Sequence, residues 1–173
     1  MTGFRLFFAL WPNDEVVNFF NHAMNDKAFA GCGRKIAKEN LHLTLAFLGT
    51  VDGQQKDQIV SIANQWQVPP FELVFDHFGY WKKPKVVWAG VSHVPQELTQ
   101  FVDGLRGDLA SLHYEVETRP YIPHLTLFRK VAKRPKLPEM RACRWQVSSF
   151  CLVSSTLTQR GAQYDVIKSW GVG

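Results

Sequence analysis

The chain has 173 residues, a length that suits one domain or two small lobes sharing a core. Hydrophobic residues make up 46% of the sequence, so the chain can bury a core and its composition excludes intrinsic disorder. The 20 basic and 15 acidic residues give a net charge of +5, a slight positive excess that is compatible with polyanionic partners.

The hydrophobic pattern alternates strands and helices along the chain, and no linker-like stretch divides it. The first half of the chain is expected to contain a buried strand over residues 5–11, a helix from 14 to about 27, a strand ending at 48, and a helix capped by Asp52 and stopped by Pro69-Pro70. Strands over 71–78 and 85–91 follow, joined by a loop over 79–84. The rest of the chain is expected to form a helix with Pro95 in its first turn, a strand over 121–128, and strands near 145–153 and 164–167. This order favours an α+β fold. We expect residues 1–173 to form a single domain made of two pseudo-symmetric lobes around a central cleft.

Two of the expected helices have a clear inward face. The second helix places Ile59, Ile62, Ala63 and Trp66 on one side, and the third buries Leu98, Phe101, Val102, Leu105, Leu109 and Leu112. These faces are typical of helices that pack on the outside of a sheet.

Cysteine usage and hydropathy bear on where the protein resides. Cys32, Cys143 and Cys151 are odd in number and lack metal-type spacing, which favours reduced thiols over a disulfide framework. No apolar run approaches the roughly 18 residues of a membrane span, and the N-terminal apolar run is too short for a signal peptide. We therefore expect a cytoplasmic protein without membrane attachment, and a monomer.

One phrase occurs twice, as His-Leu-Thr-Leu at residues 42–45 and again at 124–127. Side chains at positions i and i+2 of a strand point to the same face. His42 and Thr44 are therefore expected to share one face, with His124 and Thr126 arranged in the same way. Burying such a pair costs about 1–3 kcal/mol for each unsatisfied polar group, so its repetition indicates a site where two imidazoles and two hydroxyls meet in one cleft.

Other interpretations of the same residues have less support. Two histidines fall short of the three or four ligands of most zinc sites, and neither phrase contains a neighbouring Asp, Glu or Cys. The sequence has no Gly-x-Ser-x-Gly elbow, phosphate-binding loop or dinucleotide fingerprint. The basic segment over residues 129–144 fits either a solvated loop or a surface that binds RNA. We expect no metal and no cofactor.

The two phrases in their context, Asn40 to Gly49 and Arg119 to Leu127, resemble the two signatures of the 2H phosphoesterase superfamily. Within it, the chain most resembles the RNA 2′,3′-cyclic phosphodiesterases of bacteria and archaea, also described as 2′-5′ RNA ligases. The resemblance extends over nearly the whole length, including residues 5–9, 86–88 and 164–170. It implies a bilobal fold of two antiparallel-sheet lobes with outer helices, and metal-independent hydrolysis of a 2′,3′-cyclic phosphate to a 2′-phosphate. It also implies that Arg129 contacts phosphate.

The expected chemistry divides between the two histidines. One neutral imidazole takes a proton from the attacking water and one protonated imidazole delivers a proton to O3′. We assign His124 as the base and His42 as the acid, although approximate symmetry leaves the reverse open. Thr44 and Thr126 would donate hydrogen bonds to the phosphate oxygens. Reversal at the same site would give weak 2′-5′ RNA ligase activity.

The expected partners are RNA with a 2′,3′-cyclic phosphate end, or cyclic nucleotides. Trp81 is a candidate for stacking against the base, the alternative being a tryptophan packed on its own lobe. Two other functions stay open at this point. One is a module that binds RNA ends without turnover, and the other is a 2H phosphodiesterase acting on 2′-5′ oligoadenylate.

Overall fold

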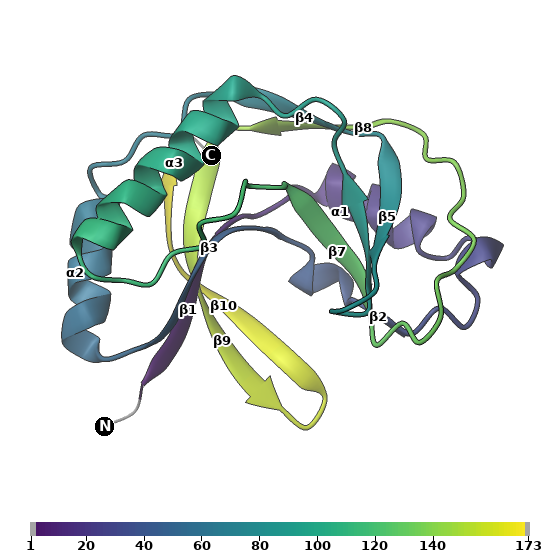
Figure 1. Ribbon diagram of the computed structural model, residues 1–173, viewed down its shortest axis with the longest axis horizontal. Helices are drawn as coiled ribbons and strands as arrows, with labels where there is room; N and C mark the ends of the chain where they lie inside the picture. The colour runs from purple at the N-terminus through teal and green to yellow at the C-terminus, as the bar shows by residue number, and fades with distance from the viewer. Residues whose placement is uncertain (1–2, 172–173) are drawn as a thin grey trace.

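Two four-stranded antiparallel sheets form the body of the molecule, which we describe from a computed structural model covering residues 3–171 (Figure 1). The first sheet has the order β10-β9-β1-β3, the second sheet has the order β2-β7-β6-β5, and β4 pairs with β8 in a two-stranded ribbon. The strands are β1 (Phe4–Leu10), β2 (Arg34–Lys35), β3 (Leu43–Val51), β4 (Phe71–Phe75), β5 (His77–Trp81), β6 (Val86–Gly90), β7 (His124–Arg129), β8 (Cys143–Val147), β9 (Ser149–Thr158) and β10 (Gly161–Gly171). The predicted α+β fold is confirmed.

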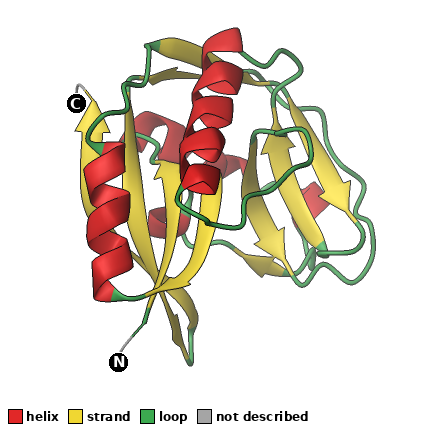
Figure 2. Ribbon diagram, turned by 60° about the vertical axis from the view of Figure 1, so that its left-hand side comes forward, coloured by secondary structure: helices red, strands yellow, loops and turns green. Residues whose placement is uncertain are grey.

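Three α-helices lie outside the sheets: α1 (Asp14–Ala23), α2 (Gly53–Ala63) and α3 (Gln96–Ser111), with short 3₁₀ turns η1 (Lys27–Phe29) and η2 (Lys38–Asn40). Figure 2 shows α2 and α3 in front of the first sheet. Trp66, just beyond α2, packs edge-on against Phe8 of β1 and donates from Nε1 to Asp108 of α3 at 2.7 Å. Helix α1 instead packs against the ribbon, where Phe20 meets Phe75. No helix among residues 3–171 is long and apolar enough to span a membrane.

The sequence pattern predicted most helix features correctly. Asp52 caps α2 and forms a capping box with Gln55, since each residue's side chain accepts from the other's backbone N–H at 2.8 Å. Leu98, Val102, Leu105 and Leu109 of α3 are buried as expected. Leu112 is exposed, because the helix ends before it and Leu112 is the C-cap. All three cysteines are buried free thiols.

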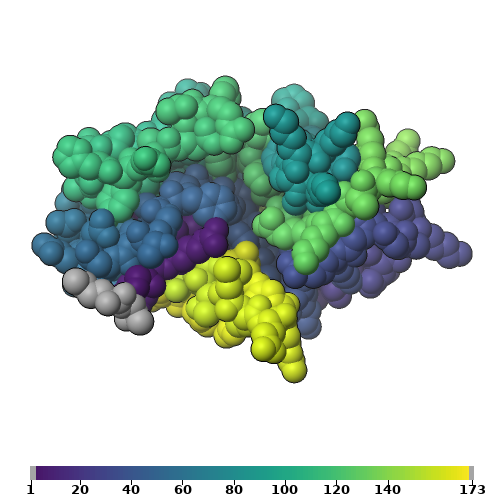
Figure 3. Space-filling model, turned by 60° about the horizontal axis from the view of Figure 1, so that its bottom comes forward, coloured from purple at the N-terminus to yellow at the C-terminus, as the bar shows by residue number. Residues whose placement is uncertain are grey.

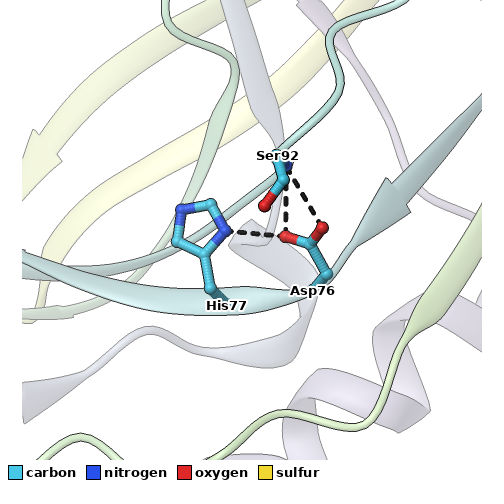
Figure 4. Close-up of polar contacts among 3 residues, drawn as sticks. All are labelled: Asp76, His77 and Ser92. Atoms are coloured by element: carbon cyan, nitrogen blue, oxygen red, sulfur yellow. Dashed lines mark hydrogen bonds and ion pairs between the residues drawn. The ribbon is translucent and has the colours of Figure 1, made fainter.

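Two predicted single strands are each divided between two sheets. Residues 71–78 split at Asp76 into β4 of the ribbon and β5 of the second sheet, and residues 145–153 split between β8 and β9. Figure 4 shows the reason at Asp76. Its carboxylate accepts hydrogen bonds from the Ser92 backbone N–H at 3.1 and 3.3 Å and from His77 Nδ1 at 2.7 Å. These polar contacts fix the change in chain direction between β4 and β5, which the hydrophobic pattern of the sequence does not predict.

Several other predicted boundaries were wrong: β3 continues past residue 48 to Val51, α2 ends at Ala63 and not at Pro69, and β7 begins at His124 and not at residue 121. Helix α1 ends at Ala23 and not near Lys27, β10 is longer than the predicted strand, and β2 was missed because it has two residues. Strand β5 also extends through Trp81, which was expected in a loop.

The second sheet carries a tightly packed aromatic layer over two glycines. A Cβ atom on Gly79 would lie 2.1 Å from the Trp88 ring, and one on Gly90 would lie 2.4 Å from it. The indole of Trp88 therefore lies directly against the backbone of β5 and β6. Trp81 packs on Trp88 with ring centroids 4.7 Å apart.

We predict that Gly79→Ala lowers the free energy of unfolding by about 1–3 kcal/mol, because the added methyl group must displace the Trp88 indole. The matched control is Gly104→Ala on the exposed side of α3, where a Cβ meets nothing within 4 Å. This control should gain about 0.5–1 kcal/mol from helix propensity. Urea unfolding of both variants checks the pair, and equal effects of the two substitutions would contradict the packing described here.

Candidate active site

The two repeated phrases hold their histidines in the same way. His42 immediately precedes β3, and its Nδ1 donates to the backbone carbonyl of Asn40 at 2.7 Å. His124 begins β7, and its Nδ1 donates to the carbonyl of Ile122 at 2.9 Å. A carbonyl oxygen can only accept, so Nδ1 carries the proton in each neutral ring and Nε2 is the nitrogen with a free lone pair. The site thus has two equivalent proton acceptors.

The strands around the histidines follow the predicted alternation. Thr44 and Thr126 are half-buried, whereas Leu43, Leu45, Leu125 and Leu127 are buried behind them. Strands β3 and β7 lie beside each other. Tyr121 links them, since its hydroxyl donates to the carbonyl of Thr44 at 2.8 Å. Burial raises the pKa of Tyr121, which keeps that donor protonated.

Aromatic rings surround both imidazoles. Trp11 stacks on His42 with ring centroids 5.4 Å apart and an interplanar angle of 6°, and Tyr164 meets it edge-on. His124 lies 4.5 Å from Trp81, also edge-on. Trp81 therefore packs on its own sheet through Trp88 and also borders the second histidine. These walls orient the rings and exclude water from them.

This environment favours neutral imidazoles. Burial, opposed by the hydrogen bond to the Asn40 carbonyl and reinforced by the positive charges of Arg129 and His124, lowers the pKa of His42 to about 4. Burial and Arg129 also lower the pKa of His124, while the Ile122 carbonyl opposes them. Both rings are therefore neutral at pH 7 in the free protein. Because Arg129 acts on both histidines, the three groups share one electrostatic environment.

A pocket opens beside His42 and reaches Thr126 of the other phrase. Figure 3 looks onto the hollow between the C-terminal hairpin, in yellow, and the segments near residues 35 and 130. His124 and Thr44 do not line this pocket. The lining includes Arg34, Arg129 and Arg160 and no carboxylate. The site is therefore suited to an anion.

Of the three arginines in the lining, Arg129 was expected from the family resemblance, whereas Arg34 and Arg160 were not predicted. These arginines come from β2 and from the turn between β9 and β10, and no spacing in the sequence indicates that they meet. The rest of the basic segment over residues 129–144 does not line the pocket. Its Arg144 is ion-paired with Glu72 on the ribbon at 2.5 Å. The segment thus supplies one residue to the site.

Two sheets that each carry a His-x-Thr strand, one contributing His42 and the other Thr126 to a basic pocket, are the arrangement expected of a phosphoesterase of the two-histidine class. Comparison with known proteins agrees with this class. A family model described as the 2′-5′ RNA ligase superfamily matches residues 13–159. The chain belongs to the 2′-5′ RNA ligase superfamily.

Several curated relatives are named RNA 2′,3′-cyclic phosphodiesterase. The protein of that name from Escherichia coli is 32% identical, covering 97% of this chain and 96% of its own length. The one from Thermotoga maritima is 30% identical, covering 94% and 92%. Among solved structures, E. coli LigT complexed with 3′-AMP has a TM-score of 0.92 at 32% identity, with 99% of each chain covered. The predicted 2H phosphoesterase fold is confirmed.

We predict that the imidazole of His42 titrates near pH 4 in the free protein, and that His124 titrates below the ordinary histidine value of about 6.5. Arg129→Gln removes a positive charge that disfavours imidazolium, so it should raise both pKa values. Arg134→Gln, which does not line the pocket, is the control and should leave them unchanged. NMR titration of the ring protons measures this, and a value for His42 at or above 6.5 would contradict the burial argument.

Proposed function

We propose that this protein hydrolyses the 2′,3′-cyclic phosphate of RNA ends or nucleotides to a 2′-phosphate. The observation that carries the proposal is that His42 and His124 each donate from Nδ1 to a backbone carbonyl, which leaves Nε2 of each ring free. The pocket beside His42 is lined by three arginines and no carboxylate. The named activity of the relatives supports the proposal. So do the complexes of LigT with 3′-AMP and with phosphate, which indicate a nucleotide ligand for the family.

The proposed reaction transfers one proton at each histidine. Nε2 of His124 takes a proton from water as the water oxygen attacks phosphorus, and the bond between phosphorus and O3′ breaks. His42 donates a proton from Nε2 to the departing O3′. Thr44, Thr126 and Arg129 hold the non-bridging oxygens, where charge changes along the path.

The proposed general acid, His42, must be protonated to act, whereas burial disfavours its protonated form. The free site holds two neutral rings, and an imidazolium there has positive neighbours. A bound phosphodiester brings one negative charge, which favours the protonated ring. We therefore infer that substrate binding is coupled to proton uptake by one histidine. Because of this coupling, kcat/KM should rise and then fall with pH.

Three further parts of the proposal follow from the same arrangement. A 5′-hydroxyl in place of water would give a 2′-5′ linkage, which accounts for weak ligase activity. Trp81, beside His124, would stack against the base.

Both histidines come from one chain, so the domain acts as a unit and the monomer suffices. Residues 1–2 and 172–173 of the predicted domain lie outside the described part.

The first test is incubation with 2′,3′-cyclic AMP, or with a short RNA ending in a cyclic phosphate, in the presence of EDTA. We expect a 2′-phosphate product, identified by chromatography against 2′-AMP and 3′-AMP. A 3′-phosphate would contradict the regiochemistry, and loss of turnover with EDTA would contradict the metal-free mechanism. Tight binding without product would favour the RNA-end-binding module. Faster cleavage of 2′-5′ oligoadenylate than of cyclic ends would favour the third function.

A second test separates the acid from the base. His42→Ala and His124→Ala should each lower kcat about 10²–10⁴-fold on the oxygen substrate. A cyclic substrate with sulfur in place of O3′ has a leaving group that needs no proton, because a thiol is far more acidic than an alcohol. On that substrate His42→Ala should recover most of its activity and His124→Ala should not. The opposite pattern would reverse the roles, and near-normal turnover of either variant would refute the two-histidine mechanism.

A further inference from the structure

The pocket beside His42 holds more positive charge than the proposed reaction uses. The mechanism assigns Arg129 to the cyclic phosphate and leaves Arg34 and Arg160 without a role. Arg34 lies in β2 and pairs with Arg129 across the β2–β7 ladder. Arg160 lies in the turn that joins β9 to β10, where its backbone N–H donates to the Thr158 hydroxyl at 3.2 Å. The two arginines approach the pocket from different sheets.

The guanidinium of Arg34 reaches the turn that carries Arg160. A Cβ on Gly161 would lie 3.2 Å from Nη1 of Arg34, so the guanidinium rests against the glycine backbone. Gly161 has φ +117°, a conformation that L side chains rarely adopt. The guanidinium of Arg34 therefore lies beside the backbone of the residue that follows Arg160. Both arginines line the same pocket, so a negative charge bound there would interact favourably with each of them.

No protein group among residues 3–171 supplies that charge. The ion pairs of this part of the chain join His77 to Asp76, Arg119 to Glu117 and Arg144 to Glu72. Neither Arg34 nor Arg160 forms an ion pair or donates a side-chain hydrogen bond in this part of the chain, and no Asp or Glu lines the pocket. Lys35 also lines it, but its ammonium is already bonded to Asn25 at 2.9 Å. The free pair of arginines therefore fits an anionic ligand.

Asn40 fixes the position of the hairpin that carries Arg160 relative to His42. Its backbone carbonyl accepts from Nδ1 of His42, and its side-chain amide donates to the carbonyl of Ala162 at 3.1 Å. Ala162 is two residues from Arg160 in the same hairpin. One residue thus orients the histidine and anchors the hairpin tip.

We propose that Arg34 and Arg160 form a second anion subsite, which binds the phosphodiester on the 5′ side of the terminal nucleotide. This inference rests on the proposed function. It makes the preferred substrate an RNA end with at least two nucleotides, since a cyclic mononucleotide has no second phosphate. Arg34 and Arg160 act in binding and do not touch the reacting atoms.

The test compares 2′,3′-cyclic AMP with the dinucleotide ApA carrying a 2′,3′-cyclic phosphate. The native protein should have a kcat/KM at least about 10-fold higher for the dinucleotide, on the scale of a charge-assisted contact. Arg34→Gln and Arg160→Gln should each remove most of that advantage, mainly through KM, and change kcat/KM for cyclic AMP less than about twofold. Arg134→Gln, which does not line the pocket, is the matched protein control.

A substrate control isolates the charge. A dinucleotide with an uncharged methylphosphonate linkage should behave like cyclic AMP with the native protein. Equal losses on both charged substrates in Arg34→Gln would assign this arginine to the cyclic phosphate and overturn the proposal. No loss in either variant, or no effect of the methylphosphonate, would overturn it as well.

Binding measurements keep this inference separate from the proposed function. If the native protein hydrolyses neither substrate, the proposed function fails. The subsite is then decided by calorimetry with ApA bearing a 2′-phosphate and with 2′-AMP. The proposal requires tighter binding of the dinucleotide, and a salt dependence of its affinity that is shallower in Arg34→Gln by about 0.7 in the log–log slope. Equal affinities of the native protein for the two ligands would refute the subsite.

Discussion

The hydrogen bond from each Nδ1 to the carbonyl two residues earlier determines what the site can do. It fixes the tautomer, because the carbonyl can only accept, and it fixes the ring so that the free lone pair is on Nε2. Both histidines lie at or just before the start of their strands, where the preceding backbone leaves a carbonyl outside the sheet ladder. The repeated phrase therefore encodes ring orientation as well as residue type. In the proposed mechanism, these two rings carry the paired proton transfer.

The surrounding aromatic residues give this arrangement a definite electrostatic character. Trp11 and Tyr164 on one side and Trp81 on the other exclude water, and the resulting desolvation disfavours imidazolium. Arg129 adds to the same effect on both rings. A phosphate anion compensates both the buried cation and the arginine. In the proposed mechanism, the charged acid therefore becomes favourable when the substrate is present.

The sequence predicted those parts of the fold that depend on local periodicity. The α+β class, the capping of α2 by Asp52 and the burial of Leu98, Val102 and Leu105 all follow from spacing along the chain. The division of residues 71–78 between two sheets depends on how Asp76 bonds to Ser92, a contact between distant residues. Ring orientation at His42 and His124 likewise needs backbone geometry. Of the four residues that the repeated phrase indicated, His42 and Thr126 line one pocket, whereas Arg34 and Arg160 in the same lining left no signal in the sequence.

The second sheet provides a physical reason for an ordered ligand along the cleft. Its strand order places Arg34 on β2 at one edge, the His124 phrase on β7 beside it, and Trp81 on β5 at the other edge. A cyclic phosphate at β7 then has cationic side chains toward β2 and an aromatic ring toward β5. In the proposed binding mode, the β2 edge holds the phosphate chain of the nucleotide and the β5 edge holds its base. Strand order in one sheet thus sets the direction in which an RNA end would lie across the two histidines.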